Sequence, residues 1–183
     1  MGPEAAPAAA PARPAVHELP YLRAYPQPLQ EQAARWLADG QLQARVLQRH
    51  PQAHTVRTDR ALYDYVAGIR SAHLRHAQAL SSVAYDNKLH VVHNALGTHT
   101  RIARVQGNKL KAKREIRIAS LFKQAPADFL RMIVVHELAH LKERDHGKAF
   151  YALCTYMEPD YHALEWDLRL WLTALELQAG PGP

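Results

Sequence analysis

The stretch His-Glu-Leu-Ala-His-Leu-Lys-Glu-Arg-Asp-His, residues 136–146, directly follows the apolar run Met-Ile-Val-Val at residues 132–135. The apolar run is typical of a core segment, so we expect a buried helix that leads into the histidines. In such a helix, His136 and His140 are separated by one turn plus roughly 40°. Both imidazoles therefore leave the same face of the helix, close enough together to share one metal ion.

Glu137 follows His136 in the sequence but points about 100° away from it around the helix. In that position its carboxylate can reach a water on the metal without ligating the ion. The H-E-x-x-H pattern thus supplies two metal ligands and one general base, as on the metal-binding helix of zinc peptidases. The alternative is an amphipathic helix that carries its histidines by chance. A third histidine at a suitable distance, His146, favours the metal site.

His146 is the expected third ligand, but a straight helix could not deliver it. It would lie about 9 Å beyond His140 along the helix axis, whereas a Zn–N bond is about 2.0–2.1 Å long. We therefore expect the helix to end between Leu141 and Asp145 and the chain to fold back. Many zinc enzymes with this histidine spacing have Gly where this chain has Glu143. We expect a turn of different shape here, with the ligand retained.

The third ligand has an alternative in the sequence. Glu158 or Glu165 could complete the site, as a downstream glutamate does in thermolysin-like enzymes. His146 would then only cap a helix.

Length and composition indicate one globular domain with helical additions. The 183 residues are 48% hydrophobic, which is enough to fill a core. No apolar stretch is long enough to span a membrane, and the N-terminus lacks the pattern of a signal peptide. The one cysteine, Cys154, cannot form an internal disulfide and is expected to be a small buried residue on a helix. We therefore expect a cytoplasmic protein without a membrane partner.

The net charge of +6 is concentrated in one segment, residues 101–117. This segment contains seven cations and one anion, so its own net charge is 7 − 1 = +6 and the rest of the chain is neutral. Such a segment can contact nucleic acid or the phosphates of a substrate. The alternative is a solvated hairpin whose charges prevent aggregation.

Composition divides the chain into four segments. An Ala- and Pro-rich start predicts a disordered tail, the next segment predicts helical accessory elements, and the H-E-x-x-H region predicts the main domain. The expected boundaries are 1–18 for the tail, 19–57 for the helical accessory segment, 58–177 for the main domain and 178–183 for a flexible C-terminus.

Periodicity and capping signals predict the secondary structure in more detail. Helices are expected from Pro28, over 42–47, from a cap at Thr58 or Asp59, from Pro126 or Asp128, over 148–157 and after Pro159. Short β-compatible runs occur at 83–86, 89–93, 100–105 and 115–120. We therefore predict an α+β fold in which a small, mostly antiparallel sheet packs on the metal-binding helix, with additional N- and C-terminal helices.

Several of these stretches resemble the YgjP-like metallopeptidases, which are relatives of the SprT-like and WLM peptidases. The resemblance covers about residues 60–175 and is carried by 136–143, His146, Lys148-Ala149-Phe150-Tyr151, Ile116 to Ser120, Ala125-Pro126 and Asp160-Tyr161. It implies a zincin-like α+β domain, a single Zn²⁺ and hydrolase activity. Because some relatives have been assigned nucleotide hydrolysis, the resemblance alone does not select peptides as the substrate.

The predicted mechanism is metal-assisted hydrolysis. His136, His140 and His146 bind Zn²⁺, and Glu137 acts as general base towards a metal-activated water. We therefore predict a zinc-dependent metallopeptidase that hydrolyses peptide bonds of a peptide or protein substrate. A nucleotide or other phosphate-containing substrate is the alternative, and a nucleic-acid-associated protein with a structural metal is the second alternative. The residues that could stabilise the developing oxyanion are Tyr151, Tyr161, His162 and His99.

Overall fold

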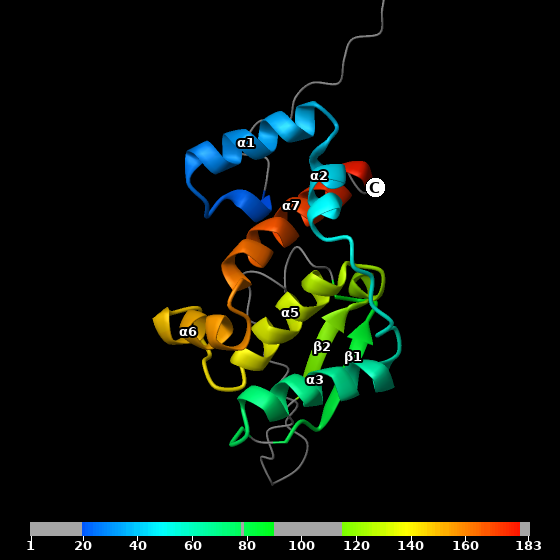
Figure 1. Ribbon diagram of the computed structural model, residues 1–183, viewed down its shortest axis with the longest axis vertical. Helices are drawn as coiled ribbons and strands as arrows, with labels where there is room; N and C mark the ends of the chain where they lie inside the picture. The colour runs from blue at the N-terminus through cyan, green and yellow to red at the C-terminus, as the bar shows by residue number, and fades with distance from the viewer. Residues whose placement is uncertain (1–19, 78, 90–114, 180–183) are drawn as a thin grey trace, which may run out of the picture.

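A computed structural model describes residues 20–77, 79–89 and 115–179 of the chain (Figure 1). The described residues form an α+β fold that is mostly helical, as predicted. Its elements are η2 (Pro20–Leu22), α1 (Gln27–Ala38), α2 (Leu42–Arg49), α3 (Asp59–His73), β1 (Ser82–Asp86), β2 (Glu115–Ala119), η3 (Ser120–Lys123), α5 (Ala127–Ala139), α6 (Lys148–Met157) and α7 (Tyr161–Ala179).

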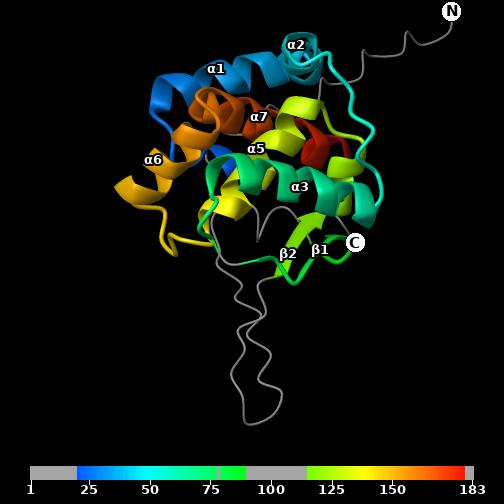
Figure 2. The ribbon, with the colours of Figure 1, turned by 60° about the horizontal axis from the view of Figure 1, so that its bottom comes forward.

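Helix α5, which carries the first histidines of the motif, is the central element of the fold. It contacts α3, α6, α7, β2 and η3, and both ribbon views place it between α3 and α7 (Figures 1 and 2). Its residues are buried almost without interruption from Phe129 to His136. A helix that is apolar on all sides is stable only when other elements surround it. The apolar run before the histidines therefore makes α5 the core of the domain.

The two described strands pair in parallel, with Ser82 opposite Glu115 and Asp86 opposite Ala119. This corrects the expectation of antiparallel pairing for these two strands. Parallel neighbours need a crossover of a dozen or more residues, and residues 87–114 separate β1 from β2. The strands expected at 89–93 and 100–105 fall almost wholly in residues 90–114, outside the described residues.

Local sequence signals explain where several helices begin and end. Pro28 lies in the first turn of α1, and the Thr58 side chain accepts a hydrogen bond from the backbone N–H of Ala61 at the start of α3. Gly40 separates α1 from α2 with a φ of +66°, a backbone conformation that glycine adopts without a steric cost. Helix α6 has the bounds predicted from the sequence.

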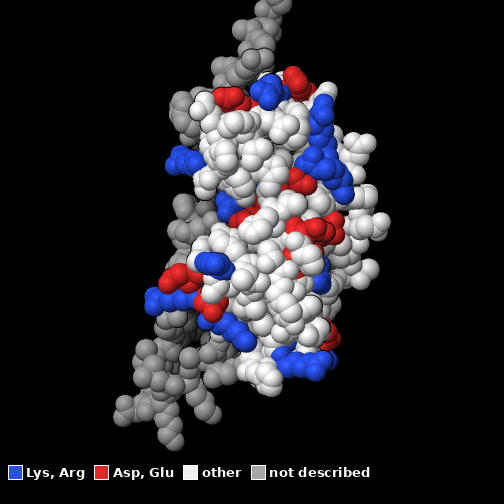
Figure 3. Space-filling view, turned by 60° about the vertical axis from the view of Figure 1, so that its left-hand side comes forward, with Lys and Arg blue, Asp and Glu red and all other residues white. Residues whose placement is uncertain are grey.

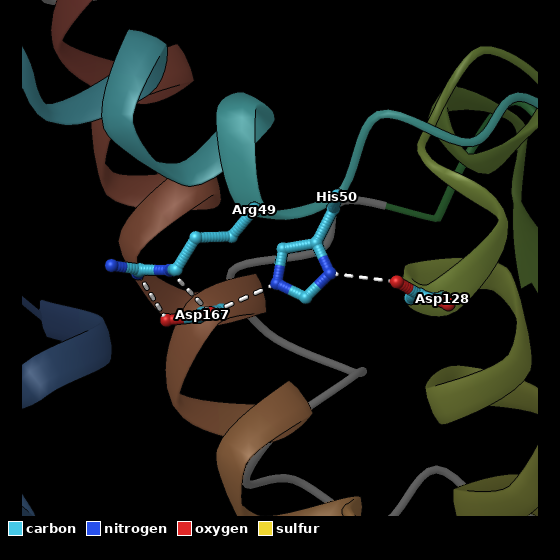
Figure 4. A network of polar contacts seen from close by, with 4 residues as sticks. All are labelled: Arg49, His50, Asp128 and Asp167. Atoms are coloured by element: carbon cyan, nitrogen blue, oxygen red, sulfur yellow. Dashed lines mark hydrogen bonds and ion pairs between the residues drawn. The ribbon is translucent and has the colours of Figure 1, made fainter.

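Helix α2 is tied to α5 and α7 by a polar network around His50 (Figure 4). His50 follows the end of α2, and its side chain is buried against the ring of Phe129. Its Nδ1 lies 2.8 Å from a carboxylate oxygen of Asp128, in the first turn of α5, and its Nε2 lies 2.9 Å from Asp167 on α7. Arg49 also donates to Asp167, at 3.0 Å. One imidazole therefore links three helices that are far apart in the sequence.

The C-terminal boundary differs slightly from the expected one. Helix α7 runs to Ala179, so the first residues of the segment 178–183 are helical, and residues 180–183 lie outside the described residues. The expected tail at 1–18 also lies outside them. Among the described residues, no helix is both long and apolar enough to cross a membrane.

Replacing His50 with Ala is expected to lower the free energy of unfolding by about 1–3 kcal/mol, because it removes two hydrogen bonds to carboxylates in a buried position. Urea or thermal unfolding measures this loss. The exposed His76 provides the control, and His76→Ala should change stability by less than about 0.5 kcal/mol. Equal stability of the two variants would show that the His50 network does not hold the helices together.

Candidate metal centre

The three histidines of the motif come from two helix ends and the turn between them. His136 lies in the last turn of α5, and His140 is its C-cap residue. His146 directly precedes Gly147, which is the N-cap of α6. His136 is buried, whereas His140 and His146 are partly exposed. The sequence prediction that these side chains converge is confirmed, because their ligand atoms form one cluster.

The cluster has the size that a tetrahedral metal ion requires. The Nε2 atoms of His136 and His140 are 3.2 Å apart, those of His136 and His146 are 3.2 Å apart, and those of His140 and His146 are 3.0 Å apart. Tetrahedral Zn–N bonds of about 2.0–2.1 Å place neighbouring nitrogens about 3.3 Å apart. The three residues therefore fit a zinc ion.

The turn that brings His146 back begins earlier than expected. Helix α5 ends at Ala139, ahead of the predicted interval from Leu141 to Asp145. The backbone N–H of Glu143 donates to the carbonyl of Ala139 at 2.9 Å, which closes the turn. No described residue other than glycine has a positive φ, so Glu143 occupies the turn without the conformation that favours glycine. The expectation of a turn of different shape is confirmed, and His146 still reaches the cluster.

Hydrogen bonds orient two of the imidazoles through their Nδ1 atoms. His140 Nδ1 lies 3.0 Å from the carbonyl oxygen of Glu143. A carbonyl can only accept, so this Nδ1 carries the proton and the Nε2 lone pair faces the cluster. His136 Nδ1 lies 2.8 Å from the hydroxyl of Tyr161. Such outer contacts fix the tautomer and the ring orientation of metal-binding histidines.

Phe150 forms an apolar floor beneath all three histidines, a role that sequence reasoning missed. Its ring is fully buried, with its centroid 5.0 Å from the ring of His136 and 4.6 Å from those of His140 and His146. The sequence feature that could have identified Phe150 is its position four residues after His146, in the first turn of α6. An apolar shell of this kind limits access of water to a metal and lowers the local dielectric.

Glu137 is the carboxylate next to the cluster in the sequence. Its side chain is partly accessible, yet the packing around the carboxyl group desolvates it and raises its pKa to about 7. A nearby divalent cation acts in the opposite direction, because it stabilises the carboxylate. A carboxyl group whose pKa lies near neutrality can both accept and return a proton.

The alternative third ligands are engaged elsewhere. Glu158 forms an ion pair with Arg131, and Glu165 lies 3.0 Å from Arg169 one turn along α7. Among the described residues, the only group of histidine, cysteine or carboxylate ligands close enough to hold a metal is the three-histidine cluster. The arrangement therefore favours His146 over both glutamates.

The candidates for oxyanion stabilisation are not equivalent in the structure. Tyr161 is fully buried and lies behind His136, on its Nδ1 side, so its hydroxyl does not face the three Nε2 atoms of the cluster. Tyr151 is partly buried. The centroid of its ring lies 6.4 Å from that of His146 and 5.3 Å from that of the exposed His162. These two residues remain next to the site, and His99 lies outside the described residues.

The basic segment 101–117 lies largely outside the described residues. At its described end, Arg117 pairs with Asp86 at 2.9 Å and with Glu115 at 3.0 Å. On the face shown in Figure 3, Lys and Arg side chains alternate with Asp and Glu, and the described atoms form no large field of one sign. The face shown thus matches the neutral charge balance of the chain outside this segment.

Comparisons with known proteins agree with this geometry. The family model described as YgjP-like, metallopeptidase domain, matches residues 107–170, which include all three histidines. The chain is 54% identical over 159 residues to a protein of Escherichia coli (strain K12) named UTP pyrophosphatase. That alignment covers 87% of this chain and 95% of the relative. No solved structure matches the chain.

The length and identity of this alignment agree with the resemblance noted in the sequence, and the matched region contains the metal-binding motif. The chain belongs to the YgjP-like family of metallopeptidase-domain proteins.

Proposed function

We propose that this protein is a zinc-dependent pyrophosphatase that hydrolyses a phosphoanhydride bond of a nucleoside triphosphate. Membership of the YgjP-like family supports a metal-dependent hydrolase, and the name of the 54% identical relative supports a nucleotide substrate. The observation that carries the proposal is the cluster of three imidazole nitrogens 3.0–3.2 Å apart. The proposal therefore favours the alternative drawn from the sequence over peptide hydrolysis.

His136, His140 and His146 would hold the ion through their Nε2 atoms. A bound Zn²⁺ supplies a Lewis acid that polarises water and phosphoryl oxygens. The apolar ring of Phe150 would limit the access of water to the three histidines, which strengthens electrostatic interactions with the substrate. Three protein ligands would leave one position of a tetrahedral ion for water or substrate.

Glu137 is the proposed general base. Its position supports this role, because it lies on the same helix as two ligands but projects about 100° away from His136. Its carboxylate would accept a proton from the attacking water and would return a proton to the leaving phosphate. Phosphate oxygens also need cationic partners, and we propose the basic segment 101–117 as their source.

Peptide hydrolysis is the second candidate function, favoured by the description of the family model as a metallopeptidase domain. A peptide could add to a sheet edge as an extra strand. A nucleic-acid-associated protein with a structural metal has less support. Structural zinc usually has four protein ligands, and the cluster found among the described residues has three.

Replacing Glu137 with Gln is expected to lower kcat for nucleoside triphosphate hydrolysis by about 10²–10⁴-fold, because the amide cannot accept the proton. Bound zinc should remain stoichiometric, since Glu137 is not a proposed ligand. The control is Glu31→Gln on α1, which makes the same chemical change at an exposed position. Equal turnover by Glu137→Gln and the unmodified protein would exclude Glu137 as the base.

Replacing His146 with Ala is expected to abolish stoichiometric zinc binding, because two imidazoles alone leave the ion with too few protein ligands. Elemental analysis after dialysis measures the zinc content. His76→Ala, a histidine change at an exposed position, should retain one zinc ion per chain. Stoichiometric zinc in His146→Ala would instead assign the third ligand to Glu158 or Glu165.

A substrate panel distinguishes the two candidate functions. We expect the zinc-loaded protein to hydrolyse UTP and to leave an unfolded protein substrate intact, with both products of UTP measured by phosphorus NMR. Neutralising Lys109, Lys111 and Lys113 should raise the KM for UTP, because these residues are the proposed phosphate contacts. Proteolysis without any nucleotide hydrolysis would overturn the proposed substrate class and would support the peptidase.

A further inference from the structure

Tyr161 makes a direct contact with the most buried histidine of the cluster. It is the first residue of α7, and its side chain is fully buried. Its hydroxyl oxygen lies 2.8 Å from Nδ1 of His136, and the two rings are nearly parallel, at an interplanar angle of 18°. His136 is 3% exposed, so water cannot readily replace the hydroxyl as the partner of Nδ1.

The direction of this hydrogen bond follows from the chemistry of the cluster. A metal at the centre takes the Nε2 lone pair of His136, so the single proton of the neutral ring must be on Nδ1. Nδ1–H then donates to the oxygen of Tyr161. The tyrosine proton is then directed away from the imidazole.

A hydroxyl differs from the carbonyl that holds His140. The carbonyl of Glu143 only accepts, and it therefore selects one tautomer of His140 under all conditions. The Tyr161 hydroxyl can also donate, which would leave the proton of His136 on Nε2, directed at the other histidines. A metal on Nε2 removes this ambiguity, because the proton of the neutral ring is then on Nδ1 and the tyrosine oxygen accepts it.

We propose that Tyr161 is the positioning residue for His136: its hydroxyl accepts the Nδ1 proton and thereby directs the Nε2 lone pair at the metal. This inference rests on the proposed function only through the metal site. Tyr161 contacts neither water nor substrate in this role. It acts through the orientation and basicity of His136, so its removal should change metal affinity before it changes the chemical step.

The test is Tyr161→Phe, which keeps the buried ring and removes only the hydroxyl. Zinc affinity, measured by competition with a chromophoric chelator, should fall by about 10–100-fold. The matched control is Tyr85→Phe, which removes a partly buried hydroxyl that donates to the carbonyl of Val56 at 2.6 Å. That variant should keep the zinc affinity of the unmodified protein. If Tyr161→Phe folds and binds zinc as tightly as the control, the proposal is overturned.

A second measurement uses the unmodified protein and does not depend on the folding of a variant. Nitrogen-15 NMR of the zinc-loaded protein should show His136 with a protonated Nδ1 and a zinc-bound Nε2. A zinc-bound Nδ1 would refute the positioning role. Absence of any tight zinc binding by the unmodified protein would refute the proposed function as well. Tight zinc binding with equal affinity in Tyr161→Phe would refute only the role of Tyr161.

Discussion

Three imidazole nitrogens within 3.0–3.2 Å of one another impose a strong constraint on the surrounding chain. The carbonyl of Glu143 holds the proton of His140 on Nδ1, so at least one lone pair points into the cluster without a proton of its own. Lone pairs gathered in this way repel one another unless a cation or a proton lies between them. The structure therefore places a site for positive charge at the end of its most buried helix.

Helix α7 is linked to α5 by polar contacts at both ends of α5. Tyr161, at the start of α7, contacts His136 in the last turn of α5. Two turns further on, Asp167 shares the imidazole of His50 with Asp128, in the first turn of α5. Helix α2 also packs on α7, so it supports the position of α7 against α5. The position of the metal helix is thus set by polar contacts at its two ends and by apolar packing between them.

Local patterns in the sequence predicted much of this site. The spacing of His136 and His140 is a property of one helix, and the distance to His146 demanded a turn, so both could be predicted from helix geometry alone. Their outer contacts could not be predicted in this way. Tyr161 follows His136 by 25 residues, and the floor formed by Phe150 depends on how α6 leaves the turn. Such contacts arise only when separate helices pack together.

The sheet and the substrate were predicted less well, for two different physical reasons. Short alternating runs such as Glu115–Ala119 identify a strand, but its partner and direction depend on the path of the connecting chain. The H-E-x-x-H motif predicts a metal and a general base, but the two together can serve hydrolysis of an amide or of a phosphoanhydride. Substrate choice depends on groups around the open side, and function must be argued from those groups, not from the fold.

X-ray absorption at the zinc edge of the zinc-loaded protein tests the metal centre most directly. The account predicts three imidazole nitrogens and one further light atom at about 2.0–2.1 Å, with multiple-scattering features from three histidine rings. A sulfur scatterer at about 2.3 Å would contradict it, because it would make Cys154 a ligand. A protein that takes up no zinc under these conditions would contradict it completely.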